Sequence, residues 1–142
     1  MVKYLLDTNV VSELYKGIDT SPGYAFVNRI DAGDLWLCAI TVGEIQKGCS
    51  AMPQGRKRMN LQSWLNGLES TFVDRILSFD IETAHIWGEL IARTNAHGFN
   101  IGVPDTMIAA CAIQHGMHVV TRNVKDFEPT GVLLINPWEG EG

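Results

Sequence analysis

A short apolar stretch near the start of the chain begins at Val2, includes Tyr4–Leu6 and leads directly into the acidic residue Asp7. The stretch predicts a buried strand, and Val10–Tyr15 predicts a helix for which Asn9 or Ser12 could be the N-cap. An acid between a strand and a helix lies at the carboxyl end of the strand, the edge where open α/β sheets bind ligands. Asp7 is therefore either a simple helix cap or a functional carboxylate.

Strand-like and helix-like segments alternate along the rest of the chain. Strands separated by helices need crossover connections, which produce a mostly parallel sheet with helices on both faces. No linker or internal repeat divides the chain, so we expect a single α/β domain over residues 1–142. Strands are predicted at residues 35–40, 75–79, 118–121 and 132–135, helices at 24–30, 41–51, 56–72, 82–96 and 106–115, and a loop at 122–127.

Composition restricts the surroundings and partners of the protein. No apolar run reaches the roughly 18–20 residues of a membrane span, and no signal-peptide pattern is present, so we expect a cytoplasmic protein without membrane contact. Cys38, Cys49 and Cys111 have apolar neighbours and are predicted to be reduced core residues. The net charge of −5 argues against a protein that coats nucleic acid, unless metal ions bridge the two.

Four acidic residues are predicted to meet at one edge of the sheet. Asp7 ends the first strand, Glu44 follows the second by one helical turn, Asp105 opens a helix, and Asp126 lies in the loop after the fourth strand. Two carboxylates about 4 Å apart repel by roughly 4 kcal/mol at an effective dielectric near 20, so such a cluster calls for a divalent cation. Oxygen ligands favour Mg²⁺ or Mn²⁺, which can activate water against a phosphate.

Glu44 also has a purely structural explanation. It lies three residues after Thr41, which matches a capping box in which both side chains only serve the start of a helix. The alternative is that Thr41 caps the helix while Glu44 faces the cleft. The sequence around these two residues does not choose between the two interpretations.

Other catalytic classes find little support in the sequence. The four histidines have no spacing useful for catalysis, and the nucleophile-elbow, P-loop, dinucleotide-binding and C-x-x-C motifs are absent. A haloacid-dehalogenase-like phosphatase would need a second aspartate two residues after Asp7, where this chain has Asn9. The acidic cluster is therefore the best candidate for the chemistry.

Four segments resemble, in order, the motifs of PIN-domain ribonucleases. Leu6–Glu13 resembles the first acidic motif, Ala39–Ile45 the second, Pro104–Ala110 the third and Val120–Phe127 the fourth. The closing Asn136–Trp138 resembles the tail of the FitB-like branch of VapC toxins. Each motif alone is weak, but four in this order cover nearly the whole chain.

The resemblance implies a Mg²⁺-dependent endoribonuclease, for which Mn²⁺ can substitute, that acts as the toxin of a type II toxin–antitoxin pair. Such proteins cleave RNA, are usually homodimers, and are inhibited by an antitoxin of the VapB/FitA type that obstructs the acidic site. The alternative is a non-catalytic PIN-like module that binds only RNA or a partner. The three intact acids argue against that alternative.

The resemblance also assigns roles to particular residues. Asp7, Glu44 and Asp105 match the catalytic, metal-binding acids of the family, whereas the fourth position is occupied by either Asn123 or Asp126. Asp126 is expected to be catalytic or to support the site from outside. Polar neighbours of the acids are expected to contact the substrate or to hold the carboxylates, and they are Thr8, Asn9, Thr121 and Asn123.

Overall fold

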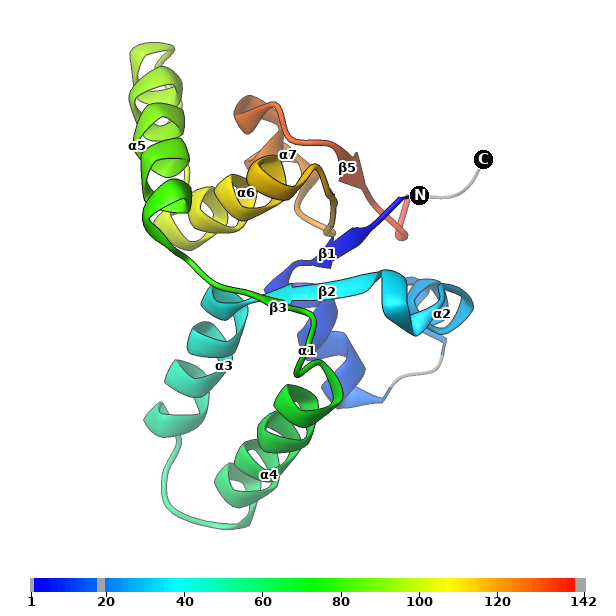
Figure 1. The fold of residues 1–142 in the computed structure, drawn as a ribbon. Helices are drawn as coiled ribbons and strands as arrows, with labels where there is room; N and C mark the ends of the chain where they lie inside the picture. Colours follow the sequence, from blue (N-terminus) through cyan, green and yellow to red (C-terminus); the bar gives the residue numbers. More distant parts are fainter. Residues whose placement is uncertain (1, 18–19, 140–142) are drawn as a thin grey trace.

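The structure is a computed structural model that describes residues 2–17 and 20–139. Five strands form one sheet in the order β3-β2-β1-β4-β5, and every pair of neighbouring strands is parallel (Figure 1). The predicted α/β fold with a parallel sheet is therefore confirmed. The strands are β1 (Tyr4–Leu6), β2 (Leu35–Cys38), β3 (Ile76–Leu77), β4 (His118–Val120) and β5 (Leu134–Ile135).

Helices cover both faces of this sheet. Figure 1 shows α5 and α6 on one side of the strands, and α1, α3 and α4 on the other. Two 3₁₀ turns, Ala32–Asp34 and Glu128–Thr130, complete the connections. The helices are α1 (Thr8–Lys16), α2 (Pro22–Arg29), α3 (Ala39–Ala51), α4 (Arg56–Thr71), α5 (Ile81–Ala96), α6 (Val103–His115) and α7 (Val124–Phe127).

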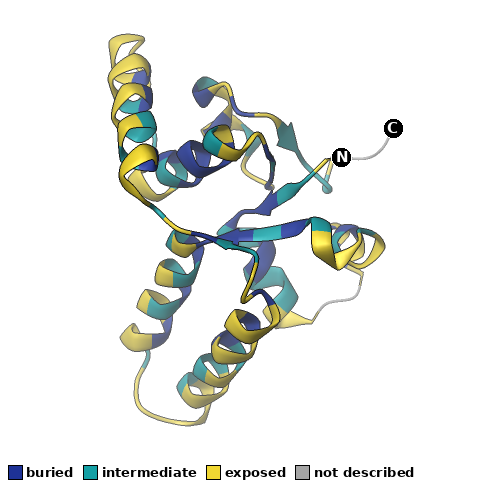
Figure 2. Ribbon diagram, in the orientation of Figure 1, coloured by how far each residue is buried: buried dark blue, intermediate teal, exposed yellow. Residues whose placement is uncertain are grey.

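Two hydrophobic cores lie on the two faces of the sheet, and the strands contribute alternately to them. Leu5 and Val119 belong to the core under α5 and α6, whereas Leu6 and Val120 belong to the core that includes α1 and α4. Successive residues of a strand point to opposite faces, so a central strand covered on both sides is apolar throughout. Figure 2 shows the resulting burial of the central strands. As predicted, all three cysteines are buried and unbridged.

The order of the strands creates a switch point beside β1. The chain passes from β1 outward to β2 and β3, and then crosses back to add β4 and β5 on the other side of β1. Beyond the carboxyl ends of β1 and β4 the connections diverge, which leaves a crevice where α/β sheets bind ligands. Asp7 and Thr121 follow these two strands, and the Asp7 N–H donates to the Val120 carbonyl at 2.9 Å.

Both interpretations of the sequence had Thr41 cap a helix, and the structure contradicts this cap and with it the capping box to Glu44. Helix α3 begins at Ala39, directly after β2, and its N-cap is Cys38, which makes no side-chain capping bond. Thr41 therefore lies inside the helix, where its buried hydroxyl is 3.2 Å from the hydroxyl of Thr8. Because Glu44 has no capping role, its carboxylate is available to the cleft.

Other predicted boundaries also shift. Asp7, not Asn9 or Ser12, is the N-cap of α1, and residues 122–127 are not all loop because α7 begins at Val124. Phe127 explains this short helix, since its side chain is fully buried in the core under α6. The predicted strands are all longer than the observed ones, at one end or at both. Among the described residues, no helix is long and apolar enough to cross a membrane.

Candidate active site

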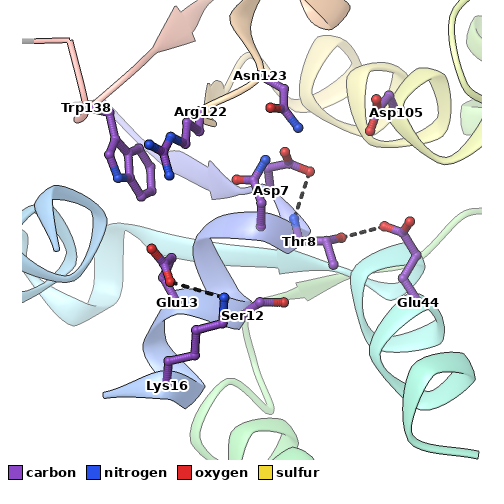
Figure 3. A pocket seen from close by; sticks show the side chains of 11 residues that line it. Asp7, Thr8, Ser12, Glu13, Lys16, Glu44, Asp105, Arg122, Asn123 and Trp138 are labelled. Carbon is purple, nitrogen blue, oxygen red and sulfur yellow. Dashed lines mark hydrogen bonds and ion pairs between the residues drawn. The ribbon is translucent and has the colours of Figure 1, made fainter. Parts of the chain in front are cut away.

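A pocket of about 430 Å³ lies at the switch point and brings together three of the four predicted acids (Figure 3). Asp7 enters it from the end of β1, Glu44 from α3 and Asp105 from the first turn of α6. The three come from distant parts of the chain, so only the fold assembles them. The pocket is lined by Asp7, Thr8, Asn9, Ser12, Glu13, Lys16, Glu44, Asp105, Arg122, Asn123 and Trp138.

Asp7 is both a helix cap and a member of the pocket. Its side chain is only 3% exposed, and its Oδ1 accepts the Thr8 backbone N–H at 2.7 Å. Its Oδ2 accepts the hydroxyl of the buried Thr121, also at 2.7 Å. Both oxygens are thus held by β1, α1 and β4 together, and the two interpretations of Asp7 from the sequence are compatible.

The pocket favours protonated acids or a bound positive charge. Burial raises the pKa of Asp7 to about 6, against the hydrogen bonds from Thr121 and Thr8 and with the help of the charges on Glu44 and Asp126. Burial, followed by the charges on Asp7 and Asp126, raises the pKa of Asp105 to about 6 as well. Within the described part of the chain, no cation forms an ion pair with Asp7, Glu44 or Asp105.

A hydroxyl holds the third acid. The Thr8 Oγ1–H donates to Glu44 Oε1, so the first residue of α1 connects to α3 across the pocket (Figure 3). Thr8 therefore contacts two of the three acids, Asp7 through its backbone and Glu44 through its side chain. This arrangement fixes the separation between two carboxylates that would otherwise repel each other.

The donors fit a hard divalent cation in kind. Carboxylate oxygens are the ligands that Mg²⁺ and Mn²⁺ prefer. The raised pKa values of Asp7 and Asp105 mean that a nearby positive charge would stabilise the ionised form of each. Over residues 2–17 and 20–139, no three His, Cys, Asp or Glu side chains stand close enough to hold an ion by themselves. This suits Mg²⁺, which usually takes one or two carboxylates and keeps several of its waters.

The fourth predicted position is divided between two residues. Asn123 lines the pocket, and its backbone N–H donates to the Thr121 hydroxyl at 2.9 Å. Asp126 is exposed on α7 and lines a neighbouring hollow with Arg122 and Asn123. Its charge still reaches the site, because it raises the pKa of Asp7 and Asp105. We therefore expect Asp126 to support the site from outside.

Asp126→Asn should consequently have a small effect on cleavage. We expect turnover to fall by about threefold or less. The change removes the charge of an exposed side chain, which solvent screens, and Asp126 does not line the pocket. Glu44→Gln should reduce turnover much more. Single-turnover cleavage rates of the two variants make the comparison, and a loss in Asp126→Asn that equals the loss in Glu44→Gln, at unchanged melting temperature, would contradict this expectation.

Five residues that line the pocket were not predicted from the sequence to belong to the site, and one of them, Ser12, was considered only as a helix cap. Glu13 and Lys16 could have been found, because they follow Asn9 and Ser12 on one face of α1 and pair with each other at 3.7 Å. Arg122 lies between two residues that were singled out, but its charge was not considered. Trp138 carried no signal beyond its place in the tail, because only the fold brings it back to β1.

Comparisons with known proteins give a consistent result. A family model described as PIN domain matches residues 4–131. The chain is 39% identical over 136 residues to a VapC ribonuclease from Sinorhizobium fredii, covering 95% of this chain and 97% of that one. It is 35% identical to the toxin FitB from Neisseria gonorrhoeae, covering 94% and 97%. A solved structure of FitAB bound to a DNA fragment has a TM-score of 0.89, with 34% identity and 98% of each chain covered.

Proposed function

This chain belongs to the PIN-domain family, in the group of VapC and FitB proteins, and from that premise we propose that it is a metal-dependent endoribonuclease and the toxin of a toxin–antitoxin pair. One observation carries the proposal. Asp7, Glu44 and Asp105 line one pocket at the switch point of the sheet. Among the described residues, no basic side chain forms an ion pair with them. Asp7 is buried and Glu44 and Asp105 are half-buried, and carboxylates removed from water without a counter-charge are costly unless a cation binds.

The three acids share one part in the proposed reaction, which is to bind the cation. Asp7 and Asp105, whose pKa values are both raised to about 6, would bind Mg²⁺ or Mn²⁺ together with Glu44 and with waters that the cation keeps, because the three carboxylates do not stand close enough to enclose an ion by themselves. When bound, such a cation supplies a water of lowered pKa and a positive charge next to a phosphate. The net reaction would be hydrolysis of the RNA backbone, in which the oxygen of a water bonds to phosphorus, one P–O bond breaks and the leaving oxygen takes a proton.

The residues around the acids keep the site in shape. Thr121 holds Asp7, Thr8 holds Glu44, and Asn123 is fixed beside Thr121 by its backbone N–H. Preorganised groups of this kind lower the cost of positioning a substrate. Because the whole chain carries a net charge of −5, long-range attraction does not bring RNA to the protein, and binding depends on the cation and on local basic groups.

We also propose a partner and an assembly. An antitoxin of the VapB/FitA type would inhibit the protein by obstructing the acidic pocket, and an arginine of the antitoxin would suit the unpaired carboxylates. The similarity to a structure of FitAB supports this partner. A homodimer is proposed from membership of the family.

The choice of RNA as the substrate has a direct test. Purified protein with Mg²⁺ should cleave structured RNAs, including transfer RNA, and should leave DNA of the same sequence uncut or cut it at least about tenfold more slowly. The expected products are two fragments from internal cleavage, resolved on a denaturing gel. The outcome also separates the enzyme from a binding module.

Two results would count against the proposal. Binding of RNA without cleavage, in the presence of Mg²⁺ and Mn²⁺, would favour the non-catalytic module. Equal cleavage of RNA and DNA would remove the restriction to RNA, while leaving a phosphodiesterase.

A further inference from the structure

An arginine and a tryptophan line the pocket together, on the side opposite Asp105 in Figure 3. The guanidinium carbon of Arg122 lies 5.3 Å from the centre of the Trp138 ring, a cation–π arrangement. Arg122 follows β4, whereas Trp138 belongs to the tail of the chain. Nothing in the chemistry proposed above gives a role to this pair.

The Trp138 ring is held firmly in its place. Its backbone N–H donates to the Asn136 side chain at 2.9 Å, and the ring packs against the core that includes Phe26. The ring also lies so close to Gly23 of α2 that a Cβ there would be 2.4 Å from Cη2. Only a glycine at position 23 leaves room for the ring. Helix α2 and the tail therefore together position the Trp138 ring on which Arg122 stacks.

The backbone around Arg122 is held by hydrogen bonds of the two neighbouring residues. The side chain of Thr121 is bonded to Asp7, and the backbone N–H of Asn123 is bonded to Thr121. The guanidinium is exposed and forms no ion pair with a carboxylate of residues 2–17 or 20–139. A pocket that contains three acids thus also holds an arginine that forms an ion pair with none of them and stacks on the Trp138 ring.

We propose that Arg122 binds a phosphate of the RNA backbone at this pocket, and that Trp138 is the positioning residue that holds its guanidinium there. The proposal rests on the proposed function, since it places an RNA strand in the pocket. A guanidinium matches two phosphate oxygens with a planar pair of N–H donors, and stacking on a ring fixes that plane before the phosphate arrives. The tail therefore acts in substrate binding.

The test measures binding of RNA without cleavage. A fluorescent single-stranded RNA oligonucleotide is titrated with protein carrying Asp7→Asn, and the dissociation constant is determined at several salt concentrations. In that background, Arg122→Ala should raise the dissociation constant about tenfold at physiological salt. It should also make the slope of log affinity against log salt shallower by about 0.7, the value for one lost phosphate contact on a single strand.

The chain offers a closely matched control. Arg29 also stacks on an aromatic ring, with its guanidinium carbon 5.1 Å from the centre of Phe26, but it does not line this pocket. Arg29→Ala should leave both the affinity and the salt slope unchanged. Arg122→Lys should keep the salt slope and lose about threefold in affinity, because it retains the charge and loses the fork.

Trp138 is tested by rescue. Trp138→Ala should weaken binding by several-fold, and Trp138→Phe should restore most of the loss because it keeps an aromatic face for the arginine. Melting temperatures separate this effect from a loss of folding. A Trp138→Phe variant that folds but binds as poorly as Trp138→Ala would contradict the positioning role.

The outcomes separate this inference from the proposed function. If the wild type cleaves RNA but Arg122→Ala binds RNA as Arg29→Ala does, the inference fails and the ribonuclease stands. If the variants bind as expected but the wild type does not cleave, the inference stands and the enzyme fails. If no RNA binds at all, both are overturned.

Discussion

Replacing Asp7 with asparagine is expected to abolish RNA cleavage while making the metal-free protein more stable. The change removes one of the three carboxylates in the pocket, and we expect turnover to fall about 1000-fold or more, or about 4 kcal/mol. Single-turnover cleavage of a labelled RNA measures this loss. A variant that cleaves at the wild-type rate would remove Asp7 from the site.

The gain in stability follows from burial of the charge. Asp7 is 3% exposed, and its pKa of about 6 in the folded protein against an ordinary 3.8 corresponds to a penalty of at most about 3 kcal/mol at neutral pH. Asparagine is neutral and caps a helix as well as aspartate does. Chemical denaturation at pH 7 without metal should therefore show a higher free energy of unfolding for Asp7→Asn.

Asp80 provides the matched control for this experiment. It is also a helix N-cap, accepting the Thr83 N–H at 3.0 Å, but it lies outside the pocket and its hydrogen bonds to Thr83 lower its pKa. Asp80→Asn should leave cleavage unchanged and should not stabilise the protein. A gain in stability from Asp80→Asn as large as that from Asp7→Asn would show that the cause is not the buried charge.

Removal of divalent metal is expected to stop cleavage completely, and return of Mg²⁺ or Mn²⁺ to restore it. The same ions should stabilise the fold, because they neutralise the charges of Asp7, Glu44 and Asp105. These acids form no ion pair with a basic side chain in the part of the chain that the structure describes. Thermal unfolding with and without Mg²⁺ gives a measurement that does not depend on activity. Undiminished cleavage in excess chelator would exclude metal-dependent chemistry.

The stability of the metal-free protein should depend on pH with a definite sign. Asp7 and Asp105 both have pKa values of about 6 in the folded state, above the ordinary 3.8. Between pH 3.8 and about pH 6, the folded state therefore binds protons that the unfolded state has released. The contribution to stability is complete below about pH 3.8 and is lost as the pH rises through about 6. The metal-free protein should therefore lose stability relative to Asp7→Asn across this range.

Addition of Mg²⁺ should reverse this trend. The ion competes with protons for the same oxygens, so its effect on the melting temperature should be small at pH 5 and large at pH 7. Since the two aspartates interact, the midpoint of the transition belongs to the pair and not to either residue. An effect of Mg²⁺ that is equal at both pH values would indicate binding elsewhere on the protein.

Local chemistry in the sequence determined a large part of this protein. The apolar stretches with an acid at the end predicted β1 and the position of Asp7, because burial of a strand and its abrupt end at a charge are both local properties. Asp105 was likewise predicted to open a helix, and the structure places it in the first turn of α6, which begins at Val103. Local chemistry thus placed these two acids on their elements, and the fold then brings them into one pocket with Glu44.

Only the tertiary structure decided the rest. Whether Thr41 caps a helix or lies buried inside it depends on packing against Thr8, a residue in another part of the chain. The strand order, which puts β4 beside β1 and so Thr121 beside Asp7, leaves no trace in either segment alone. The position of Trp138 against Gly23 and under Arg122 likewise depends on contacts between distant segments, because a side chain's neighbours in space are set by how whole elements pack.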